Sequence, residues 1–188
     1  GLVGSEMCIR DRVDSTINEV KQLDILVIPG GALETLLLTK DSTLITWIQQ
    51  IDKQSKYTTS VCTGAWILGA TGLLKGKHVT TNWYRADEMM NLYGAHFEKK
   101  RYIKDGKYWT SAGVTAGLDM SLAIVNDLFG EKYTQGVMLD LEYDPQPPFN
   151  AGSFDKTQPI VAEMMKTMYD MIMLPLIQGE QKRGLNIK

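Results

Sequence analysis

The stretch from Tyr57 to Ala70 constrains the fold most, because it joins a strand pattern directly to a helix pattern. Its first half, YTTSV, is β-branched and aromatic, and its second half, TGAWILGA, is small and apolar without proline or charge. The first half therefore predicts a short strand, and the second predicts a buried helix. Cys62 lies at the junction between them.

Cys62 has Ser60 two positions before it and Gly64 two positions after it. This spacing is typical of a nucleophile elbow, a sharp strand-to-helix turn in which small neighbours leave room for a strained side chain. The N-terminus of the following helix favours the thiolate form of the sulfur. A buried structural cysteine is the alternative, because a free cysteine often behaves as a small hydrophobic residue. The spacing and the junction together favour a nucleophile.

Composition limits the class of protein. A chain of 188 residues with 44% hydrophobic and 22% charged residues is typical of one globular domain. The net charge of −2, without a basic stripe, argues against a nucleic-acid partner. The two cysteines, Cys8 and Cys62, imply no disulfide framework and favour a reducing, cytoplasmic location. The two histidines and the lack of paired cysteines predict no metal site.

Residues 1–12 are set apart from the rest of the chain. The run Glu6-Met7-Cys8-Ile9-Arg10-Asp11 resembles a translated sequencing adapter, and no hydrophobic period crosses it. We therefore interpret residues 1–12 as a non-native segment and residues 13–188 as a single domain.

Strand and helix patterns alternate along that domain. The uninterrupted run ILVI after Asp24 predicts a strand buried on both faces, which Pro29-Gly30-Gly31 ends. Asp105-Gly106 predicts a hairpin between strands 97–103 and 107–110. A further strand is expected at 78–81, and helices are expected at 42–55, 63–74, 83–92, 118–129, 132–141 and 160–177. This order predicts an α/β domain with a mostly parallel sheet.

The last helix pattern is rich in methionine. Glu163, Lys166 and Asp170 interrupt it, so a membrane span is not expected. Packing in the core or an arm that contacts a second copy of the chain explains it better.

Three segments carry a family resemblance: SVCTGAWILGATGLLKGKHVTTNW, SAGVTAGLDMSL and LEYDPQPPFNAGS. From about Asp24 to Pro159 the chain resembles the ThiJ/PfpI superfamily, which is class I glutamine amidotransferase-like. The branch it resembles holds isonitrile hydratases and the sensor domains of AraC-type regulators. The resemblance implies a flavodoxin-like three-layer sandwich, a homodimer, a small-molecule substrate and no cofactor.

The resemblance also implies roles for particular residues. Cys62 would attack the substrate carbon, and water would be added to an isonitrile to give an N-substituted formamide. The backbone N–H groups of Thr63 and Gly31, beside Gly30, would face the developing negative charge, and the Thr63 hydroxyl would assist proton movement. The pocket would be lined by Gly113, Val114, Thr115 and Ala116.

The chain departs from the family pattern in two places. Asn82 stands where the TTxW segment usually carries histidine, and an asparagine forms hydrogen bonds but cannot transfer a proton at neutral pH. The family's acidic partner lies upstream of the Pro-Gly-Gly turn, where this chain has only a short lead-in. We therefore expect the sandwich to lack its first strand–helix units and this acid, whose absence could leave the chain inactive.

Two other functions remain open. One is a glyoxalase- or deglycase-like activity on small aldehydes. The other is a sensing domain related to AraC-type regulators, which either binds a ligand or is oxidised reversibly at Cys62. An enzyme would lose turnover in Cys62→Ser, whereas an oxidation sensor would form a sulfenic or sulfinic adduct without turnover.

Overall fold

The computed structural model describes residues 13–184, with side chains described up to residue 178. The segment 1–12 and Cys8 lie outside these described residues. The main sheet has the strand order β1-β2-β6-β5 and consists of β1 (Ile25–Ile28), β2 (Tyr57–Val61), β5 (Tyr102–Asp105) and β6 (Tyr108–Ser111). Strands β1, β2 and β6 are parallel, and β5 pairs with β6 in the antiparallel hairpin that Asp105-Gly106 predicted.

The register of the parallel strands brings three turns to one edge of the sheet. Ile28 pairs with Ser60, and Val61 pairs with Ser111. The segments that follow β1, β2 and β6 therefore emerge side by side. This is the edge at which open α/β sheets usually bind ligands.

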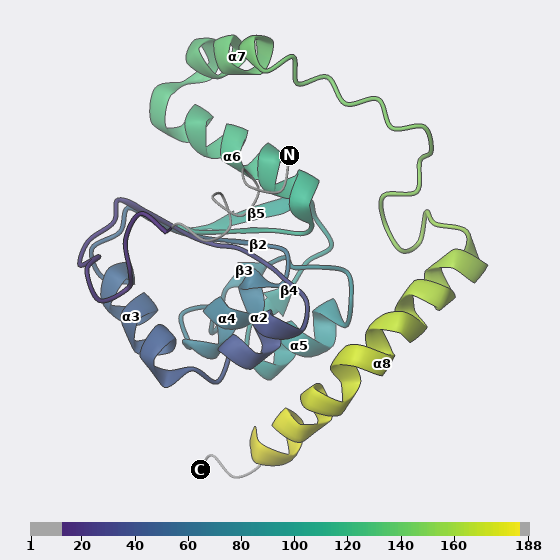
Figure 1. The fold of residues 1–188 in the computed structure, drawn as a ribbon. Coiled ribbons are helices and arrows are strands. Elements are labelled where there is room, and N and C mark those ends of the chain that lie inside the picture. Colours follow the sequence, from purple (N-terminus) through teal and green to yellow (C-terminus); the bar gives the residue numbers. More distant parts are fainter. Residues whose placement is uncertain (1–12, 185–188) are drawn as a thin grey trace, which may run out of the picture.

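Helices cover the sheet on both faces (Figure 1). One face carries α6 (Val114–Phe129), which continues into α7 (Glu131–Asp140). The other face carries α2 (Leu33–Leu38), α3 (Ser42–Asp52), α4 (Gly64–Ala70) and α5 (Ala86–Leu92). A small parallel ribbon of β3 (His78–Val79) and β4 (His96–Phe97) lies beside them. The predicted mostly parallel α/β sandwich is confirmed.

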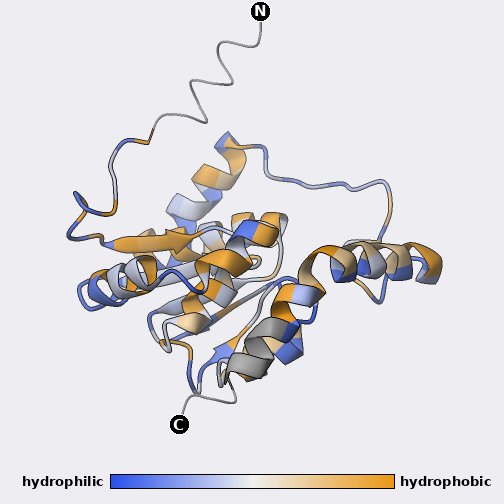
Figure 2. Cartoon of the chain, turned by 60° about the horizontal axis from the view of Figure 1, so that its bottom comes forward, coloured by the Kyte–Doolittle hydropathy of each residue, from blue (hydrophilic) through white to orange (hydrophobic). Residues whose placement is uncertain are grey.

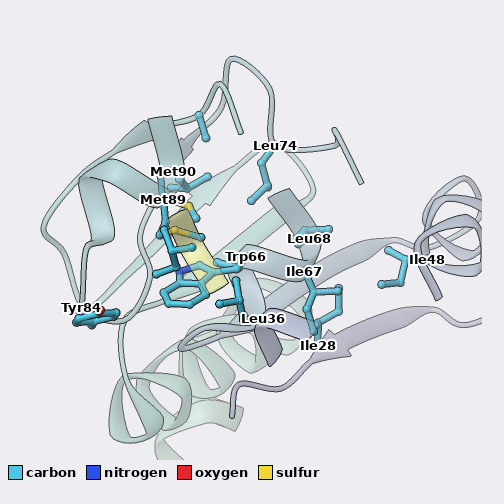
Figure 3. Close-up of a cluster of buried hydrophobic side chains, with 14 of the residues drawn as sticks. Ile28, Leu36, Ile48, Trp66, Ile67, Leu68, Leu74, Tyr84, Met89 and Met90 are labelled. Atoms are coloured by element: carbon cyan, nitrogen blue, oxygen red, sulfur yellow. The ribbon is translucent and has the colours of Figure 1, made fainter. Parts of the chain in front are cut away.

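The larger hydrophobic core lies between the sheet and the α2–α5 layer. Trp66 is completely buried there, and Leu36 and Met89 lie around it (Figure 3). Burial of each such side chain contributes about 1.5–3 kcal/mol. A smaller cluster under α6 holds Tyr57 and Trp109. Helix α4 thus lies at the centre of the core, as its apolar sequence predicted.

Local chemistry explains where several helices begin and end. Asp41 caps α3 as expected, and its carboxylate accepts hydrogen bonds from the backbone N–H groups of Thr43 and Leu44 at 2.9 and 3.0 Å. Helix α4 ends at Ala70 rather than near Leu74, because the Thr71 hydroxyl donates to Leu68 O and Gly72 takes φ 79°. The helix predicted from Trp83 begins only at Ala86, because Arg85 is left-handed at φ 48°.

Two strand predictions and the start of one helix need correction. Helix α6 begins at Val114 rather than at the predicted Leu118. The predicted strand 97–103 is divided between β4 and β5, because its start pairs with β3 and its end with β6. The predicted strand 78–81 is only two residues long. Helix α2, which follows the Pro-Gly-Gly turn directly, was not predicted from the sequence.

Strand β1 is not buried on both faces, as the run ILVI predicted. Val27 is 56% exposed, whereas Leu26 and Ile28 are buried. Helix α6 packs mainly over β2, β5 and β6 rather than over β1, so Val27 stays exposed. The strand is hydrophobic along its whole length (Figure 2).

Helix α8 (Pro159–Gly184) runs along the side of the molecule after an irregular connection (Figure 1). Met173 and Ile177 are buried against the core, whereas Met164 and Met171 are 63% and 75% exposed. No helix within the described part of the chain is long and apolar enough to cross a membrane.

Candidate active site

Cys62 lies in a strained turn between β2 and α4. Its backbone has φ 57°, a left-handed conformation that non-glycine residues rarely adopt. Two hydrogen bonds hold it there: the Cys62 N–H donates to Ser111 O at 3.0 Å, and the Thr81 hydroxyl donates to Cys62 O at 2.8 Å. Strain of this kind persists where the surroundings over-determine it, and it concentrates at functional sites. The side chain is half-buried.

Asn82 is the side chain that approaches the sulfur. Its Nδ2 donates toward Cys62 Sγ at 3.4 Å. Its Oδ1 accepts the backbone N–H of Tyr84 at 2.9 Å, which sets the orientation of the amide. Asn82 is only 8% exposed. The residue in the place of the family histidine therefore does contact the cysteine, as a hydrogen-bond donor.

The glycine turn after β1 packs directly against this turn. A Cβ atom at Gly30 would lie 2.7 Å from Cys62 Cβ and 3.0 Å from the backbone N of Thr63. A Cβ atom at Gly64 would lie 2.3 Å from Ile28 O. Both positions therefore need glycine for the close approach of the two turns, not for an unusual backbone angle.

Thr63 joins the two turns through its hydroxyl. Its Oγ1 accepts the Gly31 N–H at 3.0 Å and donates to Gly31 O at 2.8 Å. The Thr35 hydroxyl oxygen lies 3.3 Å from Thr63 Oγ1. The Gly31 N–H is thus engaged with Thr63, so its predicted contact with an oxyanion requires this hydrogen bond to open. That role stays a prediction.

The segment after β6 reaches the same edge of the sheet. Gly113 precedes α6, and a Cβ atom at Gly117 would lie 3.0 Å from a Val61 methyl group, so α6 begins beside the end of β2. Ala116 is buried, whereas Val114 is 77% exposed. Thr115 is exposed and accepts a hydrogen bond from Arg101 Nη2 at 3.3 Å. Their role as a pocket lining stays a prediction.

The His78 ring is at the surface and pairs with Glu98 at 2.6 Å. Hydrogen bonds from Lys100, and then from His78, hold the pKa of Glu98 below its usual range.

Within residues 13–178, no three His, Cys, Asp or Glu side chains are placed to hold a metal ion. Two surface hollows, one against α3 and one on α7, do not include Cys62.

Sequence reasoning missed the residues that hold the site in place. Thr81, Ser111 and Tyr84 each bond to Cys62 or Asn82. The sequence did point to Thr81, since this residue belongs to the TTxW segment on which the family resemblance rests. The other two act through backbone atoms, which any residue type supplies.

The comparison with protein families decides the classification. The sequence profile of the DJ-1/PfpI family matches residues 4–127, which include the glycine turn after β1 and Cys62. The chain belongs to the DJ-1/PfpI family.

Three relatives show the range of this family. An isonitrile hydratase from Pseudomonas putida is 41% identical over 149 residues, which cover 79% of this chain and 64% of the relative. The crystal structure of a ThiJ/PfpI family protein from Pseudomonas syringae matches with a TM-score of 0.79 and 37% identity, over 84% of this chain and 65% of that one. A deglycase from Pyrococcus horikoshii is 32% identical over 110 residues, 57% of this chain and 64% of its own.

HTH-type transcriptional regulators of Pseudomonas aeruginosa also match, at 26% identity or less and over about a third of their length. The chain thus spans slightly less than two thirds of the hydratase and of the crystallised protein.

Proposed function

We propose that this chain is a cysteine-dependent enzyme of the isonitrile hydratase type. One observation carries the proposal: Cys62 stands in a strained turn at the carboxyl edge of the parallel sheet, with its sulfur in contact with the Asn82 amide. The 41% identity to an isonitrile hydratase supports the reaction class.

The first step is addition of the Cys62 thiolate to the terminal carbon of R–N≡C. A carbon–sulfur bond forms, one carbon–nitrogen π bond breaks, and a proton from water reaches the carbon, which gives the thioimidate Cys62–S–CH=N–R. Asn82 stabilises the thiolate before the attack by donating from Nδ2. The backbone N–H of Thr63 is the proposed donor to the negative charge that develops on the substrate.

The second step is hydrolysis of this adduct. Water adds to the carbon, and its proton passes to the nitrogen, which gives the tetrahedral species Cys62–S–CH(OH)–NH–R. The hydroxide left by the first step takes the hydroxyl proton of this species as the carbonyl forms and the sulfur is expelled. The product is R–NH–CHO, and Cys62 returns as the thiolate beside Asn82. The net reaction adds one water molecule, with no change that requires a metal or an organic cofactor.

The test is conversion of tert-butyl isonitrile to N-tert-butylformamide, followed by the formyl proton in NMR. We expect turnover by the wild-type chain and none by Cys62→Ser, because serine has no thiolate to attack the carbon. Equal rates in the two proteins, or no product with a folded wild-type chain, would contradict the proposal.

A deglycase-like activity is the second candidate, because the Pyrococcus horikoshii deglycase is 32% identical. The same thiolate would attack an aldehyde carbonyl instead of an isonitrile carbon. Loss of methylglyoxal in the presence of the chain, without formamide production from the isonitrile, would favour this candidate.

A further inference from the structure

Helix α8 is connected to the Cys62 side chain by a continuous set of hydrogen bonds. Asp170 Oδ1 accepts from the Tyr84 hydroxyl at 2.9 Å and from Arg85 Nη2 at 3.3 Å. Lys166 donates to Asp170 Oδ2 at 2.6 Å. The Asp170 carboxylate therefore ties the C-terminal helix to the segment that follows Asn82. Asp170 and Tyr84 are 86 residues apart in the sequence.

Aromatic rings pack this segment against α8 and the connection that precedes it. The Tyr84 side chain is 1% exposed, and its ring centroid lies 5.1 Å from that of Tyr169 on α8. Trp83 lies 5.2 Å from Tyr169 and stacks on Phe154 at 5.4 Å. The segment 83–85 is thus fixed between α8 and the body of the molecule.

The backbone of this segment sets the orientation of Asn82. Arg85 is left-handed at φ 48° and is held by Glu88 at 2.5 Å as well as by Asp170. The Tyr84 N–H then donates to Asn82 Oδ1. Since the amide oxygen is occupied by a donor, the amide nitrogen is the end that faces Cys62 Sγ.

The Asp170 carboxyl is ionised well below neutral pH. The hydrogen bond from Lys166, followed by that from Tyr84, lowers the pKa of Asp170 to about 2. The tie between α8 and Tyr84 is therefore present throughout the neutral range.

We propose that Asp170 and Tyr84 are positioning residues for Asn82, so that helix α8 controls how well the Asn82 amide stabilises the Cys62 thiolate. The inference rests on the proposed role of Cys62 as the nucleophile. Neither Asp170 nor the Tyr84 hydroxyl needs to contact the substrate, because both act through the backbone of residues 83–85.

The test measures alkylation of Cys62 by iodoacetamide in the full chain, with the modified residue identified by mass spectrometry. We expect the rate at pH 7 to fall about fivefold in Asp170→Asn and in Tyr84→Phe, since each loses a bond that aligns Asn82. Tyr84→Phe keeps the buried ring, so it tests the inference even if Asp170→Asn folds poorly. Glu163→Gln, an exposed change on the same helix, is the matched control and should alkylate as the wild type does.

A second comparison separates positioning from a general loss of structure. In an Asn82→Leu background, Tyr84→Phe should cause no further decrease, because the amide that it aligns is gone. Wild-type alkylation in both Asp170→Asn and Tyr84→Phe would overturn the inference, and so would an undiminished Tyr84→Phe effect in the Asn82→Leu background. Normal formamide production by both variants would overturn it as well, whereas alkylation that depends on Tyr84 without any turnover would overturn only the proposed function.

Discussion

At the scale of single residues, the site depends on how closely two turns approach each other. The turn after β1 contributes Gly30, and the turn after β2 contributes Cys62 at φ 57°. The absence of a side chain at Gly30 leaves the space beside the Cys62 side chain and the Thr63 amide open. The proposed nucleophile and the proposed N–H donor thus share one space that a single methyl group would fill.

Gly30→Ala should therefore damage the site. The new Cβ would lie 2.9 Å from Val61 O and 3.0 Å from Thr63 N, both backbone atoms, so one of the turns must move. We expect alkylation of Cys62 to slow at least tenfold and the free energy of unfolding to fall by about 1–3 kcal/mol. Gly136→Ala is the control, because nothing lies within 4 Å of a Cβ there. A Gly30→Ala protein that alkylates as Gly136→Ala does would contradict this account.

The local pattern around Cys62 was predictable because it is local. The residue types of YTTSV and TGAWILGA specify a strand and a helix within a few positions, and their junction can only be a turn. The Asn82 contact was not predictable from residue types, since it joins positions 20 apart through the left-handed backbone of Arg85. An arginine gives no sign that it will adopt φ 48°.

At the scale of elements, a buried ionic cluster joins α3 to the opposite end of the sheet from Cys62. Asp52, only 5% exposed, accepts hydrogen bonds from the Thr58 hydroxyl at 2.7 Å and the Tyr108 hydroxyl at 3.2 Å, and pairs with Lys107 at 3.1 Å. Its partners Lys107 and Tyr108, at the start of β6, come more than fifty residues later. Sequence reasoning therefore predicted the helix and both strands but not the cluster that ties them together.

This cluster predicts a specific dependence of stability on pH. Burial, followed by the charge of Asp52, raises the pKa of Tyr108 to about 12, whereas an unfolded tyrosine ionises near pH 10. Between these values the unfolded chain loses a proton that the folded chain keeps, so the free energy of unfolding decreases as the pH rises from about 10 to about 12. In urea unfolding at pH 9, 10 and 11, the free energy of unfolding should decrease less steeply with pH in Tyr108→Phe than in the wild-type chain. Equal slopes in the two proteins would contradict the assignment.

At the scale of the whole molecule, the two edges of the sheet differ. The β5 edge belongs to a hairpin covered by α6, whereas β1 is the outermost strand on the other side. Within the described residues, no strand pairs with the outer edge of β1. The strand is apolar throughout, and Val27 is 56% exposed. Exposed, apolar edge strands favour association with other chains.

Val27→Lys should therefore reduce self-association of the chain. A charge on an exposed edge strand disfavours pairing between copies, so size-exclusion chromatography should show a shift toward the monomer. Met164→Lys places the same charge on the exposed face of α8, where Met164 is 63% exposed, and should leave the elution unchanged. A wild-type chain that is already monomeric, or a shift in Met164→Lys alone, would contradict this prediction. The homodimer implied by the family resemblance stays a prediction until this measurement.

Family membership and the α/β architecture were predictable from the sequence, because they rest on hydrophobic patterns and on motifs that lie close together in the chain. The exposure of one face of β1 was not predictable, since the run ILVI has the same hydrophobic pattern whether helices cover one face of the strand or both. Burial depends on what packs against a strand, and that depends on the rest of the molecule.

The central claim is that the fold makes Cys62 a reactive nucleophile. The most direct measurement is the rate of Cys62 alkylation by iodoacetamide at pH 6, in the folded chain and in the same chain unfolded in urea, with Cys8→Ser leaving one thiol to react. The account predicts faster alkylation in the folded chain, because Asn82 donates to the Cys62 thiolate there and the unfolded chain has no such donor. A thiol that reacts faster once the chain is unfolded would contradict it.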